Sequence, residues 1–131
     1  MSRICLDTSA YSFFKRGDVA AIEAISSSRW VGVPAVVLGE LRTGFRLGSR
    51  RERNEAELRE FLQQPIVEIL SVDDEVATIY SEIMVQLRHD GTPLPLNDVW
   101  IAAVAARDGL TVVTYDAHFT KIQRVGSQIL G

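Results

Sequence analysis

Four acidic residues have positions that point to chemistry. They are Asp7, Glu40, Asp98 and Asp116. Asp7 directly follows the apolar run 4–6, Asp116 comes three residues after the run 110–113, and Asp98 opens a very apolar segment. Glu40 is preceded by five uncharged residues. Carboxylates that converge repel one another and raise each other's pKa unless a cation lies between them. If the four meet, they predict a site for Mg²⁺ or Mn²⁺, which prefer carboxylate oxygens.

Each acid taken alone also has a structural explanation. Asp7 and Asp116 could cap the helices that follow them, and Asp98 suits the first turn of a helix because the helix dipole favours a carboxylate there. Glu40 could be satisfied by an arginine partner. For each acid taken alone, this structural alternative remains open.

The predicted chemistry is hydrolysis of a phosphodiester by a metal-activated water. Four polar residues flank the acids and are expected to orient carboxylates or hold the waters of the metal: Thr8, Ser9, Asn97 and Thr114. Zinc is not expected, because His89 and His118 share no metal-ligand spacing and each is better explained as a solvated or capping histidine. The single cysteine, Cys5, lies in an apolar run and is expected to be an inert buried thiol.

Short apolar runs separated by helical segments must position these side chains. The predicted strands cover residues 4–6, 30–33, 66–70, 110–113 and 128–130. Strands that alternate with helices require crossover connections, so the expected fold class is α/β, with a mainly parallel five-stranded sheet flanked by helices on both faces. Ligands of such sheets bind at the carboxyl ends of the strands, near the point where the strand order reverses.

The helix starts are predicted from capping residues. Thr8 or Ser9 is expected to cap the first helix, Asp18 the second, Ser71 the long helix after the third strand, and Asn97 the very apolar helix, with Pro34 at the first position of the third helix.

Length and composition indicate one globular domain over residues 1–131, with 47% hydrophobic and 24% charged residues. No apolar stretch approaches the roughly 20 residues that span a membrane, and no signal peptide is visible, so a cytoplasmic protein without membrane contact is expected. The net charge of −3 argues mildly against a surface that coats nucleic acid generally.

Four motifs in order are similar to those of PIN-domain ribonucleases. They are Leu6-Asp7-Thr8-Ser9, Gly39-Glu40-Leu41, the run from Asn97 to Ala103 (NDVWIAA), and the run from Thr114 to Phe119 (TYDAHF). In order, spacing and length the chain resembles the VapC toxins of type II toxin–antitoxin pairs, and the resemblance covers essentially the whole chain.

The resemblance implies a metal-dependent endoribonuclease, with Asp7, Glu40, Asp98 and Asp116 as an acidic quartet that binds one or two Mg²⁺ or Mn²⁺ ions. It implies a cognate VapB-type antitoxin that inhibits the enzyme, a homodimer, and contact with DNA only through the antitoxin. No position of the quartet is substituted, so the resemblance gives no sign of an inactive member.

The arginines after Glu40 fit no single role. On an ideal helix Arg42 and Arg46 point roughly 200–240° away from Glu40, so contact with RNA, contact with the antitoxin and plain solvent exposure all stay open.

Two other functions are compatible with an α/β chain of this size. A receiver domain or an aspartyl phosphatase is disfavoured, because Ser9 stands where such a phosphatase has its second aspartate and no lysine follows the fourth strand before Lys121. The other alternative is a catalytically silent PIN-like binding module that regulates through an antitoxin-like partner.

Overall fold

Five strands form one sheet in which every neighbouring pair is parallel. The structure is a computed structural model and describes residues 2–131. The strands are β1 (Arg3–Leu6), β2 (Trp30–Pro34), β3 (Val67–Leu70), β4 (Thr111–Thr114) and β5 (Ser127–Ile129). Their order across the sheet is β3-β2-β1-β4-β5, so the direction of winding reverses between β1 and β4. The predicted α/β class and the parallel five-stranded sheet are confirmed.

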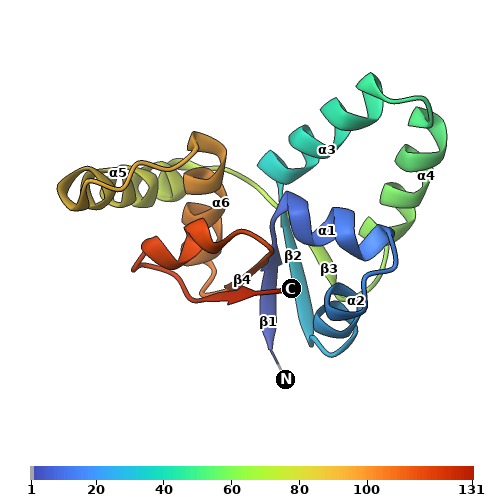
Figure 1. Cartoon of the computed structure of the whole chain (residues 1–131), viewed down its shortest axis with the longest axis horizontal. Helices are drawn as coiled ribbons and strands as arrows, with labels where there is room; N and C mark the ends of the chain where they lie inside the picture. The colour runs from blue at the N-terminus through green and yellow to red at the C-terminus, as the bar shows by residue number, and fades with distance from the viewer. Residues whose placement is uncertain (1) are drawn as a thin grey trace.

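Helices cover both faces of this sheet. They are α1 (Thr8–Lys15), α2 (Val19–Ser26), α3 (Ala35–Leu47), α4 (Arg51–Leu62), α5 (Asp74–Asp90) and α6 (Leu96–Arg107), with a short 3₁₀ helix η1 (Ala117–Lys121). Figure 1 shows α5 and α6 on one side of the sheet, α1, α2 and α4 on the other, and α3 leading away from the end of β2. The two layers follow from the strand order, because right-handed crossovers in opposite directions place their helices on opposite faces.

The core is centred on β1, β4 and α6. Residues 4–6 of β1 and residues 112–114 of β4 are buried, and residues 101–105 of α6 are fully buried. The burial of most of α6 explains its nearly continuous apolar sequence, since a helix without a polar face must be covered on all sides. The first turn of this helix, which carries Asp98, is thereby fixed against the rest of the domain.

Several predicted helix starts were wrong by one to three residues. Asp7, rather than Thr8 or Ser9, caps α1, because its side chain accepts the hydrogen bond from the Ala10 amide at 2.9 Å. The long helix α5 is capped by Asp73 instead of Ser71.

Two further predicted positions at helix starts also differ. Pro34 ends β2 and precedes α3, and α6 already begins at Leu96, so Asn97 lies inside its first turn and caps nothing. Asp18 does cap α2, as predicted.

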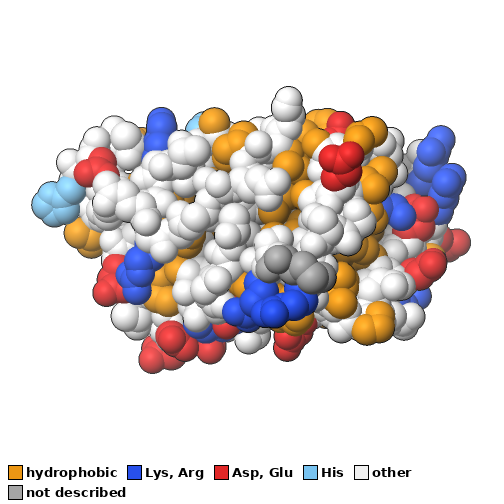
Figure 2. Space-filling view, turned by 90° about the horizontal axis from the view of Figure 1, so that it is seen from below, with side chains coloured by type: hydrophobic (Ala, Val, Ile, Leu, Met, Phe, Trp, Pro, Cys, Tyr) orange, Lys and Arg blue, Asp and Glu red, His pale blue; other side chains and the backbone are white. Residues whose placement is uncertain are grey.

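Charged and apolar side chains are mixed on the surface. Figure 2 views the molecule from the side where the chain begins, with hydrophobic side chains gathered on the half where Figure 1 places α2. Among residues 2–131, no helix is long and apolar enough to cross a membrane.

Candidate active site

Asp7 is held rigidly at the carboxyl end of β1. It is 5% exposed, and its Oδ1 atom accepts hydrogen bonds from the Ala10 amide at 2.9 Å and from the Ser9 hydroxyl at 2.8 Å. Its Oδ2 atom accepts a hydrogen bond from the hydroxyl of Thr114, at the end of the neighbouring strand β4. Burial raises the pKa of Asp7, while these hydrogen bonds lower it. One side chain thus caps a helix and lies at the switch point of the sheet.

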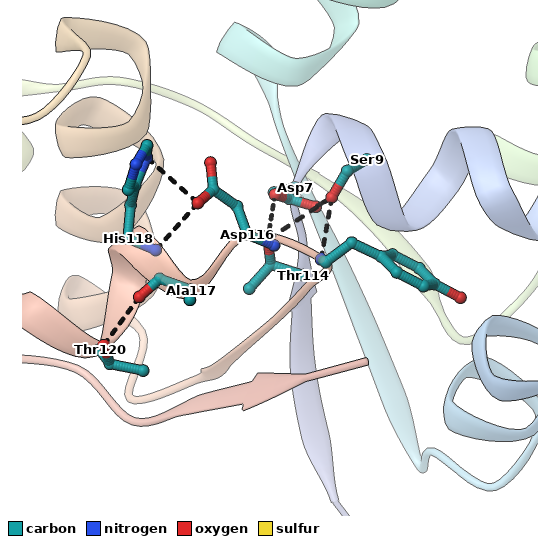
Figure 3. A network of polar contacts seen from close by, with 8 residues as sticks. Asp7, Ser9, Thr114, Asp116, Ala117, His118 and Thr120 are labelled. Atoms are coloured by element: carbon teal, nitrogen blue, oxygen red, sulfur yellow. Dashed lines mark hydrogen bonds and ion pairs between the residues drawn. The ribbon is translucent and has the colours of Figure 1, made fainter. Parts of the chain in front are cut away.

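Thr114 connects Asp7 to Asp116. The Thr114 side chain is fully buried, and its oxygen also accepts a hydrogen bond from the backbone amide of Asp116 at 2.9 Å. Ser9 forms a second link between the same segments. Its hydroxyl donates a hydrogen bond to Asp7 and accepts one from the Tyr115 amide at 3.1 Å. Figure 3 shows this network, with Asp116 beside it. The two hydroxyls fix the turn after β4 against the start of α1.

Glu40 reaches the site from α3 and is held by two polar neighbours. The Thr8 hydroxyl donates to Glu40 Oε1 at 2.6 Å, and the Asn97 side-chain amide donates to Oε2 at 3.3 Å. Residues from α1, α3 and α6 therefore meet at one carboxylate. The flanking residues Thr8 and Asn97 orient a carboxylate here, as Ser9 and Thr114 do at Asp7.

Asp98 lies among the other three acids. Burial is the largest cause that raises its pKa to about 6. The negative charges of Asp116, Asp7 and Glu40 raise this pKa further, and only His118 lowers it. The four acids that the sequence singled out therefore share one electrostatic environment at the carboxyl edge of the sheet.

The most compact set of donors at this edge contains a histidine. Atoms of Asp98, Asp116 and His118 lie within 4.8 Å of one another, and His118 Nδ1 is 3.1 Å from Asp116 Oδ1. From the sequence, His118 was expected to be solvated or to cap a helix, and its place beside the acids was missed. The sequence signal that could have found it was its position two residues after Asp116, because a tight turn brings two such residues to the same side of the backbone.

The donor set fits a divalent cation. Within residues 2–131, no lysine or arginine nitrogen lies within 4.0 Å of any of the four carboxylates. Half-buried carboxylates without a lysine or arginine neighbour are unfavourable, and a hard cation with oxygen ligands would neutralise them. Asp98 and Asp116, with His118, are the residues that could hold such an ion.

The predicted arginines do not join this cluster. Arg42 on α3 is exposed and its Nε atom is 3.2 Å from Glu55 of α4, and Arg46 is exposed near the end of α3. Neither arginine neutralises Glu40, so the alternative of a Glu40–arginine pair does not apply.

A family model and a relative of known name both match nearly the whole chain. The family model of the PIN domain matches residues 4–125. Ribonuclease VapC5 of Mycobacterium tuberculosis is 32% identical over 122 residues, which are 93% of this chain and 89% of that protein.

Solved structures agree with the sequence comparison. The DNA-bound VapBC complex of Salmonella typhimurium contains a chain that superposes with a TM-score of 0.84 at 27% identity, covering 98% of both chains. A chain of VapBC-5 from Mycobacterium tuberculosis superposes with a TM-score of 0.78 at 28% identity, covering 99% of this chain and 100% of the other. The chain therefore belongs to the PIN domain family and, within it, is similar to the VapC ribonucleases.

Proposed function

We propose that this protein is a metal-dependent endoribonuclease toxin of a VapBC-type pair. The observation that carries the proposal is the environment of Asp98, whose pKa is raised by the charges of three other carboxylates from separate parts of the chain, with no lysine or arginine nitrogen within 4.0 Å of any of the four in residues 2–131. Membership of the PIN domain family and 32% identity to a protein named ribonuclease VapC5 support the choice of RNA as substrate. Single-stranded RNA is favoured, because an unstacked strand can enter a narrow site.

The proposed catalytic residues are Asp7, Glu40, Asp98 and Asp116, with Asp98, Asp116 and His118 best placed to hold Mg²⁺ or Mn²⁺. A bound ion would make water a stronger nucleophile and stabilise negative charge on the leaving oxygen. Hydrolysis joins the water oxygen to phosphorus and breaks the bond from phosphorus to the 3′-oxygen. The proton that the water loses needs an acceptor, and the carboxylate oxygens at this edge are the acceptors that the chain supplies.

The residues that donate hydrogen bonds to the carboxylates act by positioning them. Asp7 receives three hydrogen bonds, two at Oδ1 and one at Oδ2, which fix its orientation while Oδ2 keeps acceptor capacity. Thr8 and Asn97 fix Glu40 in the same way. Preorganised acceptors of this kind need no rearrangement when the substrate binds.

The test is cleavage of a mixed RNA pool by the purified full chain with Mg²⁺, with Mn²⁺ and with EDTA. Asp98→Asn should reduce cleavage to the level seen with EDTA. Asp74→Asn is a matched control, because Asp74 also lies in the first turn of a helix but is exposed and outside the site. Its cleavage should equal that of the native chain.

Two other outcomes are possible, and only the second contradicts the proposal. Cleavage that persists in EDTA and in Asp98→Asn would show a contaminating nuclease. No cleavage under any condition, with no thermal stabilisation by either metal, would favour the catalytically silent binding module.

We further propose that a VapB-type antitoxin binds this chain, because both superposed structures are VapBC complexes. One is bound to DNA, so contact with DNA is assigned to the antitoxin. An apolar groove of about 570 Å³ between α1, α2, α4 and β3 is available for an antitoxin segment, with Phe14, Ile25 and Phe61 among its lining residues. Ile22→Asp in this groove should prevent inhibition by the antitoxin without changing cleavage by the free chain.

A homodimer is also proposed, on the resemblance to VapC toxins. Light scattering on the purified chain should then give twice the mass of one chain, whereas the mass of a single chain would contradict it.

A further inference from the structure

A polar cavity opens between α1, α3 and α4. Its volume is about 340 Å³. We call it the basic pocket and define it by Lys15 and Arg16 at the end of α1, Arg50 and Arg53 at the start of α4, and two further lining residues, Tyr11 and Glu57. None of these residues belongs to the proposed catalytic set.

The charge of the basic pocket is opposite to that of the whole protein. Four basic and one acidic side chain give its lining a formal charge of +3, on a chain of net charge −3. Lys15 pairs with Glu57 at 3.6 Å, but within residues 2–131 no carboxylate lies within 4.0 Å of Arg16, Arg50 or Arg53. Three unneutralised guanidinium groups around one cavity repel each other, and a bound anion would offset that repulsion.

Tyr11 adds a hydrogen-bond donor without an acceptor. Its side chain is 2% exposed, and its hydroxyl has no hydrogen-bond partner within residues 2–131. Burial, and secondarily the charge of Glu57, raises the pKa of Tyr11 to about 12, so the hydroxyl keeps its proton. A buried hydroxyl without a partner is unfavourable, and an anion oxygen is the kind of acceptor that would relieve it.

Two of the helices that line the basic pocket also carry residues of the acidic site. Thr8 begins α1 and bonds Glu40, and Ser12, one helical turn further on, lines the pocket. On α3, Leu41 lines the pocket directly after Glu40. One turn of helix is only about 5.4 Å long, so an extended molecule that leaves the carboxylates along α1 would reach the pocket.

We propose that the basic pocket binds a backbone phosphate of the RNA strand, flanking the phosphodiester at the acidic site. The identity of the strand rests on the proposed nuclease function. Guanidinium groups match phosphate oxygens by forming paired hydrogen bonds. An acidic peptide has similar charge, but the helices α1 and α3, which the pocket shares with a site for phosphodiester chemistry, favour RNA.

The test measures RNA binding separately from cleavage. A fluorescent single-stranded RNA is titrated with the full chain carrying Asp98→Asn, in Mg²⁺, over a range of salt concentrations. Arg50→Gln/Arg53→Gln removes two charges from the pocket, and Arg51→Gln/Arg59→Gln removes two exposed charges of α4 that do not line it. None of the four side chains makes a hydrogen bond within residues 2–131, so both double variants should fold.

The pocket variant should bind RNA roughly tenfold more weakly, and the slope of log K against log salt should fall by about 0.7, the value for one lost phosphate contact with a single strand. The α4 surface variant should keep the native slope. Equal effects of the two double variants would overturn the inference, because net charge alone would then explain binding. The inference would also be overturned, in favour of an acidic peptide, if the chain bound polyglutamate at least as tightly as RNA and Arg50→Gln/Arg53→Gln weakened that binding.

Failure of this inference and failure of the proposed function give different results. A native chain that cuts RNA, with equal binding by the two double variants, would refute only the pocket. A chain that binds RNA through Arg50 and Arg53 but never cuts it would refute only the nuclease.

Discussion

The hydroxyl of Thr114 donates a hydrogen bond to the carboxylate of Asp7, although 107 residues separate them in the chain. The bond joins the ends of β1 and β4, which are neighbours in the sheet. It holds the first acid of the site in place and, through the Asp116 amide, also fixes the position of the last.

Replacing Thr114 by valine should therefore destabilise the protein and weaken the site. Valine keeps the shape but removes the donor, which leaves a buried carboxylate oxygen less satisfied, at a cost of about 1–3 kcal/mol. Urea denaturation measures the loss. Thr114→Ser should restore most of the stability, and Thr111→Val on the same strand should cost little, because Thr111 makes no side-chain hydrogen bond in the described chain. Equal losses at Thr111 and Thr114 would contradict this interpretation.

The metal-free protein should become less stable as the pH rises from about 4 to about 6. The pKa of Asp98 is raised to about 6 in the folded protein from 3.8 in the unfolded chain. The folded state therefore binds more protons in this window, and the contribution of Asp98 to stability is full below pH 3.8 and lost as the pH passes 6. Thermal unfolding in EDTA across these pH values measures the trend.

Asp98→Asn should flatten this dependence and raise the stability at pH 7 without metal, since the buried charge is gone. The same substitution should remove the stabilisation that Mn²⁺ gives to the native chain. If the pH profile of the metal-free Asp98→Asn variant matched that of the native chain, the proposed electrostatic strain at this residue would be wrong.

His118→Ala should change which metals bind. Imidazole nitrogen favours late transition metals, whereas Mg²⁺ prefers oxygen ligands. Calorimetric titration should therefore show a larger loss of affinity for Co²⁺ than for Mg²⁺. His89→Ala is the matched control, because His89 is exposed at the end of α5. Equal losses for both metals would place His118 outside the coordination sphere.

Two glycines should respond oppositely to alanine. A Cβ atom on Gly32 would lie 2.6 Å from Leu70 Cδ1 and 3.1 Å from Leu110 Cδ1, whereas one on Gly44 meets nothing within 4 Å. Gly32→Ala should cost about 1–3 kcal/mol through overpacking between central strands. Gly44→Ala, inside α3, should add about 0.5–1 kcal/mol because alanine favours the helix. Urea midpoints of both variants provide the comparison.

The sequence predicted the strands well and the helix caps less well. The apolar runs placed each strand to within one or two residues, and in the central strands β1, β2 and β4 burial demands such side chains. Cap assignment failed at Thr8 and Asn97 because several side chains near a helix start can accept or donate hydrogen bonds, and tertiary partners decide which one caps. Here both Thr8 and Asn97 are used by Glu40, which lies far from each in sequence.

The structural alternatives for the acids are compatible with the site. Asp7 and Asp116 do cap helices, and Asp98 does occupy a first turn. A carboxylate at a helix start can therefore cap the helix or lie in its first turn and still face the other acids.

The sequence by itself determined the fold class, the order of strands and helices along the chain and the choice of the four acids, because these depend on residue type and local pattern. Only the tertiary structure decided that Asp98 faces the other three acids, that His118 joins them, and that Arg50 and Arg53 share a cavity with Lys15 and Arg16. The physical reason is that electrostatic interactions act through space: the side chains involved come from segments that local pattern cannot place relative to one another, and crossover connections and packing bring them together.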